Sequence, residues 1–164
     1  MTNESPPDQA AIHQEIAAFL TEQQTLSLAT VDDSGQVHAA NLWYAQDDQG
    51  RLYFVSHPQS AHSLNLARNR RVAATIYFAT TRAGEIHGVQ LRGRCDQLND
   101  PARERDARQL FAARFPHVLL SPDTLRRLKT ERFYCITPQW LRWIDNRRGF
   151  GFKVELEVPA SRDQ

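Results

Sequence analysis

Apolar and polar residues alternate in short runs along most of the chain, which is the pattern of strands with one buried face. The longest such run, residues 86–98, places Val89 and Leu91 on one face and Gln90 and Arg92 on the other. Further strands are predicted at residues 26–31, 37–44, 51–56, 72–78, 133–137, 140–145 and 151–158. The pattern favours a mainly β (α+β) fold, a six- to seven-stranded antiparallel β-barrel, closed or split, with helices packed outside.

Turn chemistry refines this arrangement. The first three strands are joined by short segments rich in Asp and Gly, which predicts an antiparallel meander. Gly88 and Gly93 interrupt the long strand and predict a bulge or bend in it.

Three helical segments are predicted between the strands. Apolar residues recur at helical spacing near the start, at Ile12, Ile16, Phe19 and Leu20. A short helix follows Ser60, and a longer one runs from Asn99 or Asp100 to about Phe115 before Pro116. Ser121 and Pro122 predict one or two further helical turns.

Length and charge restrict the possible functions. With 164 residues, of which 41% are hydrophobic, we expect one domain over residues 11–158, with flexible ends at 1–10 and 159–164. A net charge of +1 without a basic stripe gives no support for nucleic acid as a partner. No window approaches the roughly 20 apolar residues of a membrane span, so we expect a soluble, cytoplasmic protein.

Motifs of several enzyme classes are absent. Cys95 and Cys135 lie 40 residues apart in strand-like runs, which predicts two small core residues and no redox or metal pair. The histidines show no H-x-x-x-H or H-E-x-x-H spacing, so no metal site is predicted, and no G-x-S-x-G nucleophile motif occurs.

The strongest candidate site lies within residues 52–77. Ser60 is placed to cap the short helix, and Ala61, His62 and Ser63 form its first turn. Backbone N–H groups, two hydroxyls and an imidazole would then converge on one spot, which predicts a phosphate site. The alternative is that Ser60 is only a helix cap and His62 a solvated residue.

The same stretch resembles a known family. The residues that carry the likeness are Phe54-Val55-Ser56, Ser60-Ala61-His62, Asn65-Leu66 and Arg70-Arg71-Val72-Ala73. Over about residues 12–153 the chain is similar to the split barrels of the pyridoxamine 5′-phosphate oxidase family, which bind flavin mononucleotide (FMN). A closer likeness, to the uncharacterised YhbP-like branch, rests on residues 88–93, Arg114-Phe115-Pro116, Asp145-Asn146 and Gly149-Phe150-Gly151.

The resemblance implies a cofactor and a set of contacts. Ser56, Ser60 and His62 would hold the FMN phosphate, and Val55 and Ala61 beside them would also contact the cofactor. Asn41 and Trp43 would face the isoalloxazine ring, Gln90 would reach the cofactor of a partner in a homodimer, and Lys153 would add a cation. The alternatives are a core role for Trp43, a solvated strand face at Gln90, and a C-terminal hairpin that only closes the barrel.

Departures from the family pattern modify the functional prediction. Ala39 or Ala40 and Tyr44 stand where the oxidases have arginine and lysine, and His62 replaces a lysine. Asp145-Asn146-Arg147-Arg148 replaces the closing Trp and Arg-x-His segment, which argues against true pyridoxamine phosphate oxidation.

Three hypotheses remain open from the sequence. The first is an FMN-dependent oxidoreductase of unknown small-molecule substrate, with no catalytic residue identified and deazaflavin or haem as alternative cofactors. The second is a non-catalytic flavin- or haem-binding carrier or sensor, and the third is a cofactor-free dimeric scaffold.

Overall fold

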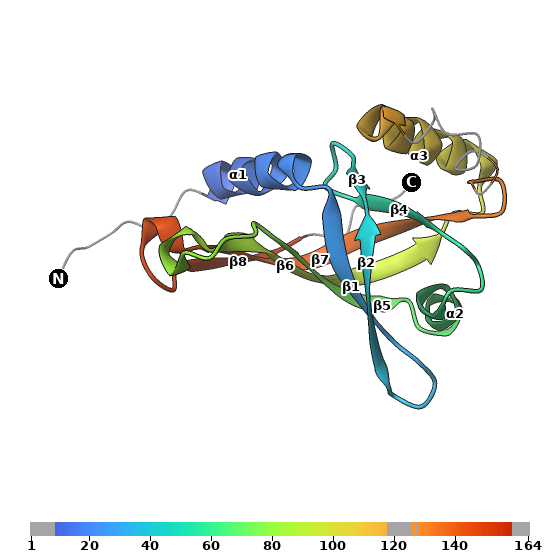
Figure 1. Cartoon of the computed structure of the whole chain (residues 1–164), viewed down its shortest axis with the longest axis horizontal. Helices are drawn as coiled ribbons and strands as arrows, with labels where there is room; N and C mark the ends of the chain where they lie inside the picture. The colour runs from blue at the N-terminus through green and yellow to red at the C-terminus, as the bar shows by residue number, and fades with distance from the viewer. Residues whose placement is uncertain (1–8, 118–125, 127, 159–164) are drawn as a thin grey trace.

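The computed structural model describes residues 9–117, 126 and 128–158. In this part of the chain a single antiparallel sheet has the order β2-β1-β5-β6-β7-β4-β3, and β8 pairs with β7 (Figure 1). The strands are β1 (Thr25–Val31), β2 (Val37–Trp43), β3 (Ala45–Gln46), β4 (Leu52–Ser56), β5 (Arg71–Tyr77), β6 (His87–Gln97), β7 (Arg132–Asp145) and β8 (Lys153–Glu157).

The two ends of this strand order belong to one continuous segment. Only Tyr44 separates β2 from β3, yet β2 pairs with β1 and β3 pairs with β4 at the opposite end of the path. Tyr44 is buried at this corner, and its hydroxyl donates a hydrogen bond to the carbonyl oxygen of Leu20 at 2.7 Å. The sheet therefore curls back on itself, and the predicted antiparallel split barrel is confirmed.

Two details of the predicted sheet are wrong. The third strand, β4, pairs with β7 and not with β2, so the first three strands do not form a meander. Residues 133–137 and 140–145 belong to one long strand, β7. The register jumps between Arg92 and Gly93, which pair with Trp140 and Pro138, so Gln139 is the extra residue of a bulge. Because of this bulge, β7 continues through Pro138, a residue that in the sequence indicates a break between two strands.

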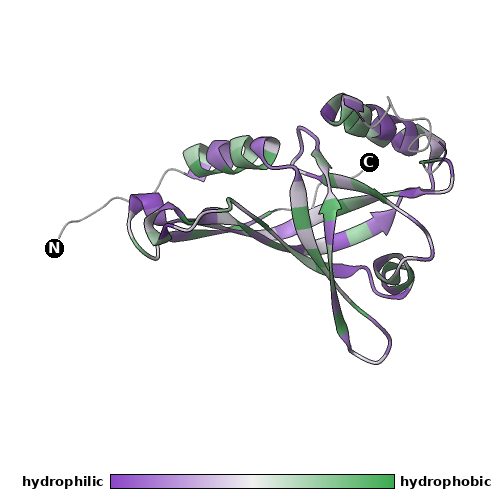
Figure 2. Ribbon diagram, viewed as in Figure 1, coloured by the Kyte–Doolittle hydropathy of each residue, from purple (hydrophilic) through white to green (hydrophobic). Residues whose placement is uncertain are grey.

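The helices match their predicted patterns. They are α1 (Gln9–Glu22), α2 (Ala61–Arg68) and α3 (Pro101–Arg114), with short 3₁₀ helices η1 (Ala83–Glu85) and η3 (Asn146–Arg148). Both α1 and α3 carry hydrophobic and hydrophilic residues along their length (Figure 2). The apolar residues of α1 join the barrel core, whereas Ala107 and Phe111 of α3 pack with Tyr53 and Phe133 on the other face of β4 and β7.

Helix α2 is fixed to the barrel by a buried polar contact. Asn65 Nδ2 donates to Thr30 Oγ1 of β1 at 3.0 Å, and both residues are buried. Leu66 of the same helix joins the barrel core. These contacts set where the N-terminus of α2 lies relative to the end of β4.

Some sequence predictions fall elsewhere. Residues 1–8 and 159–164, assigned to flexible ends, and the helical turns predicted at Ser121 and Pro122 lie outside the described residues. Within the described part, no helix combines the length and apolar character that a membrane crossing requires. Cys95 and Cys135 are free thiols buried in the core, as predicted.

We predict that Gly93→Ala strongly destabilises the protein. A Cβ atom at Gly93 would lie 2.2 Å from the Thr137 carbonyl oxygen and 3.0 Å from the Pro138 Cα, so the bulged strands would have to separate. Overpacking of this kind costs about 1–3 kcal/mol or more, measurable by urea unfolding.

Gly84→Ala is the matched control, because nothing lies within 4 Å of a Cβ atom there. Equal unfolding midpoints for the two variants would contradict the tight approach of β6 to β7.

Candidate functional site

The N-terminus of α2 is shaped by Ser60. This residue has an extended backbone (φ −68°, ψ 152°), and its Oγ accepts a hydrogen bond from the Ser63 backbone N–H at 3.3 Å. Its carbonyl oxygen accepts from the Leu64 N–H at 3.0 Å. Helix geometry leaves the N–H groups of Ala61 and His62 without intrahelical acceptors, so they are available to an anion.

Three predicted phosphate ligands meet at this helix end. His62 Nε2 lies 2.6 Å from Ser56 Oγ and 3.0 Å from Ser60 Oγ, and the two hydroxyl oxygens are 3.1 Å apart. Ser56 is the last residue of β4, so the strand supplies one residue of the cluster and the start of the helix supplies the other two. We call Ser56, Ser60 and His62 the α2 cluster.

The α2 cluster is nearly neutral in charge. Burial lowers the pKa of the His62 imidazole, so the ring is mainly uncharged near neutral pH. The edge of the ring lies against Phe54, with centroids 6.2 Å apart. A neutral imidazole donates one hydrogen bond, so the cluster by itself supplies directional donors but little net charge.

Arg132 is a cation that sequence reasoning missed. It pairs directly with Ser56 across β4 and β7, so both side chains leave the sheet on the same face. Its guanidinium donates to the Glu131 carbonyl oxygen at 3.1 Å and has no carboxylate partner among the described residues. Arg132 reaches the site through the pairing of two strands that are distant in sequence, and residue spacing does not reveal such pairing.

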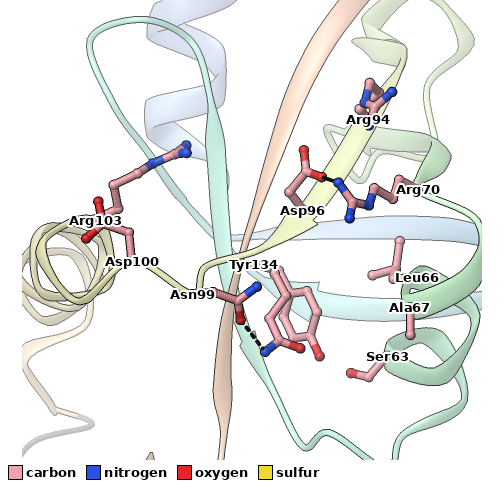
Figure 3. Close-up of a pocket in the computed structure, with 11 residues that line it drawn as sticks. Ser63, Leu66, Ala67, Arg70, Arg94, Asp96, Asn99, Asp100, Arg103 and Tyr134 are labelled. Atoms are coloured by element: carbon pink, nitrogen blue, oxygen red, sulfur yellow. Dashed lines mark hydrogen bonds and ion pairs between the residues drawn. The ribbon is translucent and has the colours of Figure 1, made fainter. Parts of the chain in front are cut away.

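A cavity of about 560 Å³ lies beside the α2 cluster. Figure 3 shows it between α2 with Ser63, the end of β6 with Arg94 and Asp96, and the start of α3 with Asp100 and Arg103. Ser63 belongs to the cavity wall and also accepts a hydrogen bond from Ser60 Oγ at 2.8 Å. The cavity and the cluster are therefore neighbours joined by the hydrogen bond from Ser60 to Ser63.

The two residues predicted to face a flavin ring have partners of their own. Asn41 Oδ1 accepts from Ser27 Oγ at 2.6 Å on the outer face of β2 and β1. Trp43 is 49% exposed and stacks on Phe115 with ring centroids 5.4 Å apart, near His117 at 5.8 Å. Trp43 is thus neither a core residue nor a free ring.

Gln90 and Lys153 lie far from the α2 cluster within one chain. Ser56 is opposite Arg132, whereas Gln90 is opposite Arg142, ten positions further along β7. At about 3.3 Å per residue this is up to about 33 Å. Gln90 accepts a hydrogen bond from Arg142 at 3.2 Å, and Lys153 is exposed on β8.

The remaining predicted contacts, and the positions that differ from the oxidases, lie as follows. Val55 faces the α3 side, opposite in direction to Ser56, and Ala61 is the exposed first residue of α2. Tyr44 is a corner residue of the core, and Asp145 is buried at the far end of β7 in contact with Arg147. Tyr44 and Asp145, two of the positions at which the chain differs from the oxidases, are thus buried parts of the barrel.

The donor set fits a phosphate group. Two hydroxyls, an imidazole and two first-turn N–H groups converge, and Arg132 starts from the same face. Of the side chains that hold haem iron, histidine, cysteine and methionine are not among the residues that line the 560 Å³ cavity, whereas one tyrosine, Tyr134, is. Among the described residues, no group of three or more His, Cys, Asp or Glu side chains could hold a metal ion.

Comparison with known proteins agrees with the sequence resemblance. A model of the family described as "Pyridoxamine 5'-phosphate oxidase" matches residues 12–145. A UPF0306 protein of Pasteurella multocida is 26% identical over 144 residues, which cover 88% of this chain and 91% of that protein. These matches confirm the predicted resemblance to the family and its YhbP-like branch.

Solved structures share the fold. The haem-binding protein from Mycobacterium smegmatis matches with a TM-score of 0.72 at 18% identity, over 94% of this chain and 60% of that one. HutZ, the haem storage protein from Vibrio cholerae, matches with a TM-score of 0.65 at 19% identity, over 76% and 88% of the two chains. At this level of identity the likeness concerns the fold alone.

We predict a pH-dependent contribution of His62 to stability. Burial lowers its pKa in the folded protein, whereas the ring has a pKa of about 6.5 in the unfolded chain. Below about pH 6.5 the unfolded chain therefore binds more protons, and the folded state loses stability as the pH falls. Urea unfolding of the wild type and of His62→Gln at about pH 7.5 and about pH 5 measures this difference.

The His62→Gln variant should lose less stability on acidification than the wild type. An identical decline in both proteins would mean that the ring is not buried as described.

Proposed function

Because the chain belongs to the pyridoxamine 5′-phosphate oxidase family, we propose that it binds FMN, with the phosphate at the α2 cluster, and acts as a flavin-dependent oxidoreductase on a small molecule. The observation that carries the proposal is the convergence of Ser56, Ser60 and His62 within 3.1 Å at the free end of a helix. These groups bond to one another, so an anion would exchange those bonds for its own.

The chain's own residues have defined tasks in this proposal. The hydroxyls of Ser56 and Ser60 and the N–H groups of Ala61 and His62 bind phosphate oxygens, and Arg132 balances their charge. His62 takes up a proton when a dianion binds, because the added negative charge opposes the effect of burial on its pKa. FMN, when bound, supplies hydride transfer, which explains why no acid, base or nucleophile is prominent.

A homodimer would complete the site. A row of paired residues crosses the outer face of six strands: Asn41, Ser27, Thr75, Gln90, Arg142 and Glu155. The next row starts with three alanines, Ala39, Ala29 and Ala73, whose small side chains allow a second sheet to approach closely. Tyr77, 65% exposed, and Trp43 lie on the same face. Gln90 and Lys153, up to about 33 Å and about 40 Å along β7 from Ser56, could then serve the partner's cofactor.

A haem-binding carrier is the second candidate. Two proteins with this fold are named for haem binding and haem storage. His117 lies beside Trp43 and Phe115, and an imidazole next to aromatic rings is a combination that haem can use. Absorbance spectra after titration with FMN or with haemin distinguish the oxidoreductase from the haem carrier. A Soret band that appears with haemin in the wild type and is lost in His117→Ala would favour the carrier.

We predict that Ser60→Ala, His62→Ala and Arg132→Gln each weaken FMN binding. Each removes one hydrogen bond or charge partner of the phosphate, worth about 1.5–3 kcal/mol, or about ten- to a hundredfold in Kd. Quenching of flavin fluorescence on titration with protein measures the affinity.

Ser34→Ala and Arg105→Gln are the controls, because they make the same substitutions on exposed positions away from the α2 cluster. FMN affinity that is unchanged in all three site variants would refute the placement of the phosphate.

We predict that Ala73→Arg dissociates the dimer. A long charged side chain in the alanine row would keep two sheets apart, while its exposed position leaves the monomer fold intact. Analytical ultracentrifugation should give the mass of two chains for the wild type and of one chain for the variant. Ala102→Arg, on the exposed start of α3, should stay dimeric, and a monomeric wild type would contradict the proposed interface.

A further inference from the structure

The 560 Å³ cavity beside α2 has a charge arrangement that the FMN proposal does not use. Its walls come from α2, the end of β6, the start of α3 and Tyr134 of β7. In Figure 3, Arg70 and Arg94 lie on one side of it, and Arg103 lies on the other, on α3. Its volume falls within the roughly 300–1,000 Å³ typical of small-molecule sites.

The two carboxylates of the cavity are already engaged. Asp96 accepts from Arg70 at 2.8 Å, the contact drawn as a dashed line in Figure 3. Asp100 is the N-cap of α3 and accepts from the Ala102 backbone N–H at 3.0 Å. Arg94 and Arg103 therefore have no carboxylate partner among the described residues, although both line the same cavity.

Neutral polar groups also line this cavity. Gln97 Nε2 donates to Asn99 Oδ1 at 3.0 Å, which leaves the Asn99 amide nitrogen and the Gln97 amide oxygen for other partners. Ser63 and Tyr134 add hydroxyls, and Leu66 and Ala67 add an apolar strip. Amides and hydroxyls on these walls suit the hydroxyl groups of a sugar, and guanidiniums suit phosphate oxygens.

We propose that this cavity binds a phosphorylated, hydroxyl-rich small molecule, such as a sugar phosphate, with Arg94 and Arg103 as the charge partners of its phosphate. The site is separate from the α2 cluster, since Ser56, Ser60 and His62 do not line the cavity and only the hydrogen bond from Ser60 to Ser63 joins the two. It does not depend on whether the protein binds flavin.

The test measures the binding of ribose 5-phosphate and of ribose to the full-length protein by isothermal titration calorimetry. Ribose 5-phosphate should bind, and ribose should bind at least about tenfold more weakly because it lacks the charged group. Arg94→Gln with Arg103→Gln should weaken ribose 5-phosphate binding by about a hundredfold, about tenfold for each guanidinium.

A charge-matched control separates local contacts from net charge. Arg82→Gln with Arg105→Gln also removes two positive charges, but from side chains that are 78% and 68% exposed and do not line the cavity. This double variant should keep wild-type affinity. Thermal melting of both double variants shows that each is folded, since all four arginines are exposed.

A third variant distinguishes the cavity from the helix end. His62→Ala removes a member of the α2 cluster that does not line the cavity, so ribose 5-phosphate affinity should stay unchanged. The proposal is overturned if His62→Ala loses ribose 5-phosphate while the Arg94 and Arg103 double variant keeps it. It is equally overturned if neither ribose 5-phosphate nor inorganic phosphate binds the wild type at millimolar concentration.

Discussion

The corner at Tyr44 is the constraint on which the rest of the structure depends. A single segment pairs with β1 before the corner and with β4 after it, so both edges of the curled sheet are held by neighbouring residues. The buried Tyr44 hydroxyl bonds to the Leu20 carbonyl oxygen and thereby ties the end of α1 to the same corner. β2 and β3 remain the two ends of the strand path, so the barrel is split and not fully closed.

This closure sets the position of the α2 cluster. Because β4 is brought against β7, Ser56 lies opposite Arg132. Phe54 and Tyr134 form another pair of the same two strands, and their rings stack with centroids 5.0 Å apart. Helix α2 is then held over this end by the Asn65 contact to Thr30. Strand, partner strand and helix each supply a part, so the geometry of the α2 cluster and Arg132 is a product of the whole barrel and not of the local motif.

The molecule separates its polar chemistry by location. The α2 cluster has directional donors and a neutral imidazole, the neighbouring cavity has two guanidiniums without carboxylate partners, and the outer sheet face has a row of small and polar residues. The first suits the phosphate of a ring cofactor, the second a separate phosphate ester, and the third a second copy of the chain. An oxidoreductase of this type would need all the chemistry of its reaction from the cofactor, with the protein providing binding and orientation.

Local rules in the sequence determined the elements and the capped helix. The apolar periodicity of α1, the cap at Ser60, Asp100 before Pro101, and the alternation along β6 each depend on neighbours within a few residues, and the structure reproduces them. The convergence of Ser56, Ser60 and His62 was predictable for the same reason, since His62 follows Ser56 by only six positions.

Only the tertiary structure decided which strands are neighbours. The pairing of β4 with β7 placed Arg132 opposite Ser56, and it separated Gln90 and Lys153 from the helix end by the length of a strand. It also gathered the arginines of α3, β6 and the α2–β5 junction around one cavity. The pairing of β4 with β7 joins residues more than 70 positions apart. It is made by backbone hydrogen bonds, which depend little on side-chain identity, so residue spacing does not predict which strands pair.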